Sequence, residues 1–294
     1  MLPAQCSPEV RSPKTLSIVT ASISGILAFP AIVCNLLIII AVIRDPVKKL
    51  RTPFNYFLIN LAFSDFLVGV LCLSLSTWVH ARESNGPLPP TFVMFIHLTL
   101  FITSTASTLS MVVLSIDRLV MITHAMKYRI YLKWKLCMKI SLLIWIIAIC
   151  LPSLYFLMGY VSYLMLHIHV LVLTTAIILI VNYAFVYKFL HRRTQSSQRP
   201  SVPSFTQTKN LIIEKQVTRT LLCIVVFFLL TMLPAMVVIY ILHFCKNCPC
   251  NVRHVLRDVC FLLFPASSAI NPLICLFRLK NISVAIKMSV FGHT

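Results

Sequence analysis

The feature that most limits what this chain can fold into is a long stretch without a charged side chain. Residues 140–187 contain no Asp, Glu, Lys or Arg. As a single α-helix this stretch is about 70 Å long, more than twice the roughly 30 Å hydrocarbon core of a bilayer. We therefore predict two membrane-spanning helices here, joined by a very short turn near Met158-Gly159.

The rest of the chain shares this apolar character. Of 294 residues, 59% are hydrophobic and 11% are charged, and the mean hydropathy is +0.92. A water-soluble protein of this length cannot bury so much apolar surface, so the natural solvent is lipid. Helix is the predicted spanning form, because the apolar stretches are too long and uniform for barrel strands. There are seven, which begin near Leu16, Pro53, Thr91, Lys135, Ser162, Leu211 and Arg253.

The formal net charge of +19 is distributed in a way that argues against nucleic-acid binding. Most Lys and Arg residues fall in four clusters, at 44–51, 118–139, 188–219 and 278–287. These clusters alternate with poorly charged turns, which is the positive-inside pattern of a multi-spanning membrane protein. A nucleic-acid-binding protein needs its basic residues on a soluble domain. With an odd number of spans, the pattern predicts an N-terminus outside the cell.

The predicted organisation has three parts. Residues 1–15 form an outer N-terminus without the features of a signal peptide, 16–277 the seven spans, and 278–294 a tail with a short amphipathic helix on the inner membrane face. The segment 191–210 is rich in Ser, Pro and Gln and is predicted to be a mobile loop. The predicted fold class is an all-α membrane protein, a seven-transmembrane helix bundle with a short amphipathic C-terminal helix.

Short motifs stand at characteristic places in six of the seven spans. They are Asn35 in VCNLLIIIAV, Asp65 in NLAFSDFLVG, Arg118 in SIDRL, Trp145 with Pro152, Glu214 with Phe228 and Pro234, and Asn271-Pro272 in NPLIC. In this order and spacing they resemble the rhodopsin-like (class A) G protein-coupled receptors. The resemblance implies a plasma-membrane receptor that contacts membrane lipids, binds an extracellular ligand and activates a heterotrimeric G protein.

The resemblance also implies an activation switch in the inner half of the bundle. In the family, the arginine at the position of Arg118 pairs with the preceding acid, Asp117, and with an acid at the base of the sixth helix, where Glu214 stands. A guanidinium between two carboxylates ties the third and sixth helices together, and outward movement of the sixth opens a cleft for the G protein. Arg118 and Met126 are the implied G protein contacts. Alternatively, Asp117 and Arg118 only anchor a helix end at the membrane interface.

Several further switch positions depart from the usual family residues. Met232 stands where the family usually has Trp, and Cys275 replaces a tyrosine, which removes a water-bridged partner of Tyr183. Pro234 removes a backbone hydrogen bond and predicts a kink. These departures predict a weaker or partly constitutive switch, whose remaining implied members are Phe228, Asn271 and Pro272.

Asp65 is the sole formal charge in the predicted core. An unpaired carboxylate at membrane depth is costly, so it requires partners or a function. The resemblance assigns Ser107, Ser268 and Asn271 to its surroundings as a sodium pocket that stabilises the inactive receptor, so Na⁺ is an implied allosteric ion and no other cofactor is expected. The alternative is a protonated aspartate in a hydrogen-bonded packing site.

The outer half indicates only the class of ligand. Leu100 stands where amine receptors keep an aspartate, so a monoamine is not expected. The mixture of aromatic, aliphatic and neutral-to-basic groups suits a lipid or a weakly anionic molecule, and a small molecule, a lipid and a peptide all stay open as ligand types. The implied pocket residues are His97, Leu100, Phe101, Ser104, His167, Met232, Ala235 and Phe261.

The cysteines predict an unusual outer surface. Val93 stands where the family has a cysteine on the third helix, and the loop around Gly159 contains none, so the usual bridge is absent. The stretch HFCKNCPC predicts a local disulfide, and a metal site that includes His243 is the alternative. The pairing is open among Cys6, Cys245, Cys248 and Cys250.

Other function classes agree less well with the sequence. A seven-helix transporter or channel usually has repeated halves and several charges along a pathway, and the sequence contains no repeat. An intramembrane enzyme needs paired catalytic groups at membrane depth, whereas Asp65 has no second carboxylate, so no enzyme activity is expected. A non-signalling receptor that scavenges its ligand stays open because of the altered switch residues.

Overall fold

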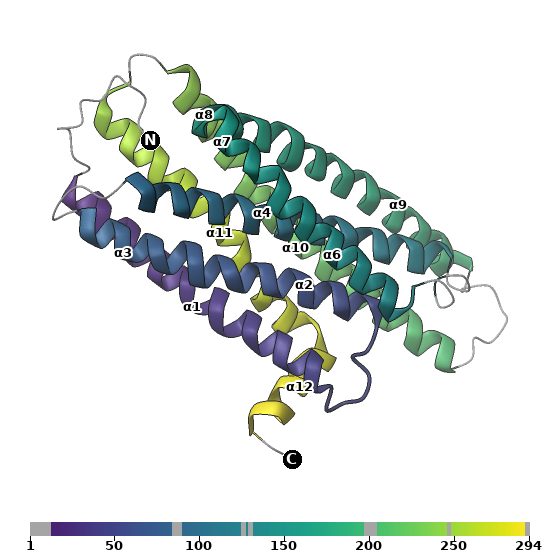
Figure 1. The fold of residues 1–294 in the computed structure, drawn as a ribbon. Coiled ribbons are helices and arrows are strands. Elements are labelled where there is room, and N and C mark those ends of the chain that lie inside the picture. The colour runs from purple at the N-terminus through teal and green to yellow at the C-terminus, as the bar shows by residue number, and fades with distance from the viewer. Residues whose placement is uncertain are drawn as a thin grey trace.

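A computed structural model describes residues 13–83, 90–124, 128, 132–196, 205–245 and 248–291. At some helical positions, among them Val93 and Glu214, only the backbone is described. The described residues form helices and no β-strand, and they include seven helical stretches long and apolar enough to cross a membrane. The predicted fold class, a seven-helix bundle followed by a short C-terminal helix, is confirmed (Figure 1).

The spans follow one another in chain order, and several consist of more than one helical segment. The first is α1 (Lys14–Arg44), and the second combines α2 (Pro53–Leu67), η1 (Val68–Leu73) and α3 (Ser74–Glu83). The third is α4 (Pro90–Thr123), and the fourth combines α6 (Trp134–Cys150), η2 (Leu151–Leu154) and α7 (Tyr155–Met158). The fifth combines α8 (Tyr160–Leu166), η3 (His167–Leu173) and α9 (Thr174–Ser196). The sixth and seventh are α10 (Phe205–Phe244) and α11 (Cys250–Arg278), which α12 (Lys280–Phe291) follows.

The two ends of the bundle are distinguished by α12 and by the turn between α7 and α8, which lie at opposite ends (Figure 1). We call the end with α12 the inner end and the other the outer end, after the orientation predicted from the basic clusters. The start of α11 lies at the outer end, and the last turns of α1, α4 and α11 lie at the inner end.

The connection between the fourth and fifth spans is a single residue. Gly159 lies between α7 and α8 with φ 75° and ψ 171°, a conformation that glycine adopts freely and other residues rarely. Its N–H donates to the carbonyl of Tyr155 at 2.9 Å, and its own carbonyl accepts from the N–H of Tyr163 at 3.1 Å. The turn predicted near Met158-Gly159 is therefore confirmed.

The segment predicted as a mobile loop at 191–210 is partly helical. The fifth span continues in α9 to Ser196, and α10 begins at Phe205 rather than near Leu211. A helix that an apolar span has already nucleated is extended by polar residues at little cost, because nucleation is the expensive step. Composition alone therefore placed these helix ends too close to the membrane.

Close packing of α1 against η1 depends on one glycine. A Cβ atom on Gly69 would lie 2.7 Å from the Cγ1 of Ile32 and 3.1 Å from its backbone nitrogen. Both distances are shorter than ordinary van der Waals contact, and the backbone nitrogen cannot turn aside. The first and second spans therefore approach as closely as they do because residue 69 has no side chain.

We expect Gly69→Ala to lower the free energy of unfolding by about 1–3 kcal/mol, the usual cost of overpacking a core. Thermal unfolding of the purified protein in detergent measures the change. The matched control is Gly25→Ala, because a Cβ atom there would meet only Thr77 side-chain atoms at 3.7 Å. It should leave the midpoint unchanged or raise it, since alanine is favoured in helices by up to about 1 kcal/mol. Equal midpoints for the two variants would contradict the close approach.

Candidate functional site

Arg118 is buried near the inner end of α4, with 6% of its surface exposed. Its Nη2 and Nε atoms donate to Oδ2 of Asp117 at 2.6 and 3.0 Å. The guanidinium carbon also lies 4.2 Å from the ring centroid of Phe54 on α2, and Nη1 lies 3.3 Å from the sulfur of Met121. An ion pair withdrawn from water is stable only with partners of this kind.

Asp117 has a second partner that sequence analysis missed. The hydroxyl of Tyr128 donates to Oδ1 of Asp117 at 2.8 Å. Burial raises the pKa of Tyr128, and the Asp117 carboxylate raises it further, so the phenol stays protonated and acts as a donor. Tyr128 follows Asp117 after the end of α4, so no helical periodicity relates the two residues. Phe54 was missed because an aromatic residue in an apolar span carries no distinguishing signal.

One predicted switch residue and one predicted G protein contact lie outside the described part of the structure. They are the side chain of Glu214, on α10, and Met126, after α4. The predicted tie between Arg118 and Glu214 and the predicted G protein contact of Met126 therefore stay predictions.

The other predicted switch residues lie on α9, α10 and α11. Phe228 and Met232 are buried on α10, while Pro234, in the same helix, is exposed. Tyr183 is partly buried on α9, and Asn271, Pro272 and Cys275 are buried on α11. These residues share the inner and middle parts of the bundle.

A small cavity lies between α4 and α10, one turn from Arg118. Its volume is about 10 Å³, at most enough for one water molecule. It is lined by Met111, Leu114, Ser115, Leu221, Ile224 and Val225. The contact between the two helices close to the buried ion pair is therefore almost entirely apolar.

The structure brings together the three residues predicted around Asp65, which is fully buried. The hydroxyls of Ser107 and Ser268 donate to Oδ1 of Asp65, each at 2.8 Å, and Nδ2 of Asn271 donates to Oδ2 at 3.0 Å. The remaining Oδ1 atom of Asn271 is buried and has no hydrogen-bond partner among the described residues. The Asp65 carboxylate of α2 is thus surrounded by two hydroxyl groups and one amide from α4 and α11, and the amide oxygen is unsatisfied.

The expectation that Asp65 is the sole formal charge in the core is wrong. Asp258 and Arg253, both on α11 near the outer end, are 1% and 2% exposed. Asp258 accepts hydrogen bonds from Thr20 at 3.0 Å and from Nε of Arg257 at 2.7 Å. The sequence did not reveal that these charges are buried, because they lie close to the end of a span, where the pattern resembles an exposed helix terminus.

The eight predicted ligand-pocket residues divide among three packing groups. His97, Phe101, Ser104 and His167 lie with the tyrosines of α7 and α8. Leu100 and Phe261 pack with apolar residues of α1 and η1. Met232 and Ala235 belong to the main apolar core.

The first of these groups contains two unsatisfied polar atoms. Nε2 of His167 lies 3.2 Å from the hydroxyl of Ser104, while Nδ1 of His167 has no partner in the part of the chain that the structure describes. The same holds for the hydroxyl of Tyr163, a fully buried residue that was not predicted for the site. Phe101 packs against both, with ring centroids 4.7 Å from Tyr163 and 5.2 Å from His167, and the rings of Tyr163 and His167 are 6.0 Å apart.

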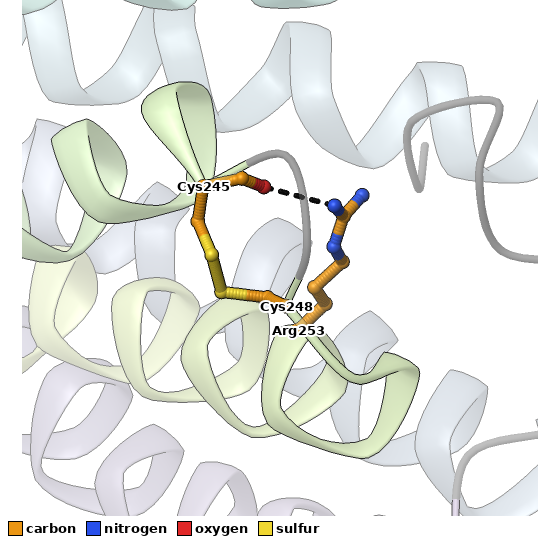
Figure 2. Close-up of a disulfide and its surroundings, with 3 residues drawn as sticks. All are labelled: Cys245, Cys248 and Arg253. Carbon is orange, nitrogen blue, oxygen red and sulfur yellow. Dashed lines mark hydrogen bonds between the residues drawn. A yellow bond between two sulfur atoms is a disulfide. The ribbon is translucent and has the colours of Figure 1, made fainter.

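The predicted local disulfide is present in the loop between α10 and α11. Figure 2 shows Cys245 bonded to Cys248, and Nη2 of Arg253 donating to the carbonyl of Cys245 at 2.9 Å. The alternative of a metal site is wrong for these two cysteines, because their sulfur atoms are bonded to each other. Cys250 is also disulfide-bonded, and Cys6 lies outside the described residues.

We expect Tyr128→Phe to lower the free energy of unfolding by about 1–3 kcal/mol, because a buried carboxylate oxygen loses its donor. Thermal unfolding of the purified protein measures this loss. The matched control is Tyr56→Phe, since the hydroxyl of Tyr56 makes no hydrogen bond within the described ranges. In an Asp117→Asn background the effect of Tyr128→Phe should shrink. An unchanged effect there would mean that the hydroxyl acts elsewhere.

Comparison with known proteins agrees with this geometry. Residues 34–274 match the family "7 transmembrane receptor (rhodopsin family)". The chain is 34% identical to the rat Histamine H4 receptor over 117 residues, which are 40% of this chain and 29% of that receptor. It is 35% identical over 124 residues to 5-hydroxytryptamine receptor 2B of Dichotomyctere fluviatilis, covering 42% of this chain and 26% of the relative.

A third relative is the pig Muscarinic acetylcholine receptor M3, 35% identical over 111 residues, or 37% of this chain and 18% of that receptor. The chain thus spans less than a third of the length of each of these relatives. The family match, in contrast, extends from the first span to the seventh. This multi-pass membrane protein therefore belongs to the rhodopsin family of seven-transmembrane receptors.

Proposed function

We propose that this protein is a plasma-membrane receptor, with its N-terminus outside, that binds an extracellular ligand and activates a heterotrimeric G protein. It acts through outward movement of the inner half of α10 and has no enzyme activity. The observation that carries the proposal is the buried Arg118–Asp117 pair at the inner end of α4 in a chain of this family.

The geometry around Arg118 supports a switch rather than an interface anchor. An arginine that only anchors a helix end extends its guanidinium into the headgroups, where water solvates it. Arg118 is instead held inside the bundle by Asp117 and Phe54. Outward movement of α10 would open space beside Leu114 and Leu221, where the cavity now measures only about 10 Å³. A guanidinium released into that space is available to carbonyl oxygens of an inserted G protein helix.

The ligand is proposed to be a largely apolar molecule with one uncharged or weakly anionic hydrogen-bonding group. The three relatives are named for histamine, 5-hydroxytryptamine and acetylcholine, which are cations at neutral pH. Here the position that holds the aspartate in amine receptors is Leu100, so such a cation finds no carboxylate at that position. A hydroxyl or carboxyl group on the ligand could instead pair with the unsatisfied atoms of His167 and Tyr163, in an otherwise aromatic site.

The shell of Asp65 is proposed to bind Na⁺ in the inactive receptor. The residues suit this ion, because they supply a carboxylate, two hydroxyl oxygens and the unsatisfied amide oxygen of Asn271, and hard cations prefer oxygen ligands. A bound cation would neutralise Asp65 and link α2, α4 and α11, which favours the arrangement in which they are close.

The first prediction concerns signalling itself. Purified protein in lipid nanodiscs should accelerate guanine nucleotide exchange on at least one heterotrimeric G protein, with apolar carboxylic acids and alcohols screened as ligands. Arg118→Ala should abolish the acceleration while ligand binding persists. Ligand binding without exchange on any G protein would favour the non-signalling, scavenging receptor. Ion flux or substrate turnover without a G protein would contradict the proposal.

The second prediction concerns sodium. Replacing K⁺ by Na⁺ at equal ionic strength should lower the affinity for an activating ligand several-fold, because Na⁺ stabilises the inactive arrangement. Asp65→Asn should remove this difference while the protein still folds, since the amide retains hydrogen-bonding capacity toward Ser107 and Ser268. If Asp65→Asn responds to Na⁺ like the unaltered protein, the sodium site is not at Asp65.

The third prediction concerns the ligand group. Tyr163→Phe should raise the thermal unfolding midpoint without ligand, because an unsatisfied buried hydroxyl costs about 1–3 kcal/mol. The same change should weaken ligand binding about tenfold or more. Tyr155→Phe, a change to a neighbouring tyrosine of the aromatic group, is the control. Loss of both stability and affinity would mean that the hydroxyl has a structural partner instead.

A further inference from the structure

The inner end of α11 is joined to α10 by a side chain that the family motifs do not include. Nε2 of Gln216, on α10, donates to the backbone carbonyl of Arg278, the last residue of α11. The last carbonyls of a helix have no partner within it and must find one outside. Leu279 satisfies the carbonyl of Cys275 at 2.9 Å, and Gln216 satisfies that of Arg278 from a different span.

The carbonyl that accepts this hydrogen bond lies beside buried residues of the main apolar core. Leu279, Ile282 and Ala285, at the junction of α11 and α12, are 7%, 2% and 0% exposed and belong to the main apolar core. The far end of α12 is held by α1, because Nη1 of Arg44 donates to the carbonyl of Ser289 at 3.2 Å. Side chains from two other spans thus complete the ends of α11 and α12.

We propose that Gln216 is a positioning residue of the activation switch, which holds the inner end of α10 against the junction of α11 and α12 in the resting receptor. This inference rests on the proposed outward movement of α10. Gln216 stands in the part of α10 that such a movement displaces, whereas the carbonyl of Arg278 stays with the core. The bond must therefore break for the cleft to open, and it stabilises the closed arrangement for as long as it is formed.

This restraint is separate from the Arg118 cluster. The described partners of Arg118 lie on α4 and α2, so they fix the guanidinium without fixing α10. Cys275 stands where the resemblance implies a tyrosine hydroxyl, and a thiol is a much weaker hydrogen-bonding group. A glutamine amide that binds the end of α11 supplies a polar link between the sixth and seventh spans near that position.

The test uses the full chain in lipid nanodiscs and three variants. Gln216→Met keeps the length and helix preference of the side chain but removes the N–H donor. Gln216→Lys keeps a donor of at least the same reach, and a cation is favourable beside helix C-terminal carbonyls. Asn281→Met is the matched control, because it also removes a side-chain amide, at an exposed position of α12.

The first readout does not depend on a G protein. Distances between probes at Arg219 on α10 and Lys135 on α6, both exposed at the inner end, are measured without ligand after incorporation of unnatural amino acids at the two sites. We expect Gln216→Met to raise the population with the longer distance about two- to tenfold, the factor that corresponds to the net strength of one hydrogen bond. Gln216→Lys and Asn281→Met should resemble the unaltered protein.

The second readout is ligand-independent nucleotide exchange, which should rise by the same factor in Gln216→Met alone. A change in distance without a change in exchange would support the role of Gln216 in holding α10 and contradict the proposed G protein function. The inference is overturned if Gln216→Met leaves the distances unchanged. It is also overturned if Gln216→Lys or Asn281→Met shifts them as much as Gln216→Met does.

Discussion

In lipid there is no water to satisfy a buried polar group, so each one has to find its partner inside the bundle, and this requirement determines how the seven spans meet. The link between the second, third and fourth spans illustrates it. Nδ2 of Asn60 donates to the hydroxyl of Ser110 at 2.7 Å, and Oδ1 of Asn60 accepts from the indole of Trp145 at 3.0 Å. One amide thereby fixes the relative positions of α2, α4 and α6, which apolar contacts alone would leave free to slide.

This requirement is not met everywhere, and some of the exceptions lie at the two proposed binding sites. The buried atoms without a described partner include Nδ1 of His167, the hydroxyl of Tyr163 and Oδ1 of Asn271. The first two lie in the outer aromatic group, and the third lies beside Asp65. An unsatisfied buried atom is a cost that a ligand or ion removes when it binds. These atoms support an assignment of binding chemistry that the apolar composition of the chain conceals.

The sequence determined the architecture well, because lipid imposes a simple rule on length and charge. The uncharged run at 140–187 predicted two spans and the turn at Gly159, and the resemblance identified the shell of Asp65 residue by residue. The sequence could not predict contacts between residues whose separation along the chain follows no helical period. Tyr128 meets Asp117 across the end of α4, and Gln216 meets Arg278 across two helices. Neither pair follows a helical period, and both depend on how chain ends turn after they leave the membrane.

The lipid environment also determines how strongly α10 is held against its neighbours. Lipid tails are as apolar as leucine, so apolar contact between spans contributes little to holding one helix against another. The contact between α4 and α10 beside Leu114 and Leu221 is mostly apolar, while the described polar links of α10 to its neighbours lie near its ends. Tyr240 meets His169 of η3 toward the outer end, and Gln216 meets Arg278 at the inner end. Each such hydrogen bond contributes only about 0.5–1.5 kcal/mol to the stability of the closed arrangement. A ligand that binds the open arrangement only modestly more tightly than the closed one can therefore shift a helix held by a few of them. In the proposed mechanism, this weak restraint is what would let ligand binding at the outer end change the position of α10 at the inner end.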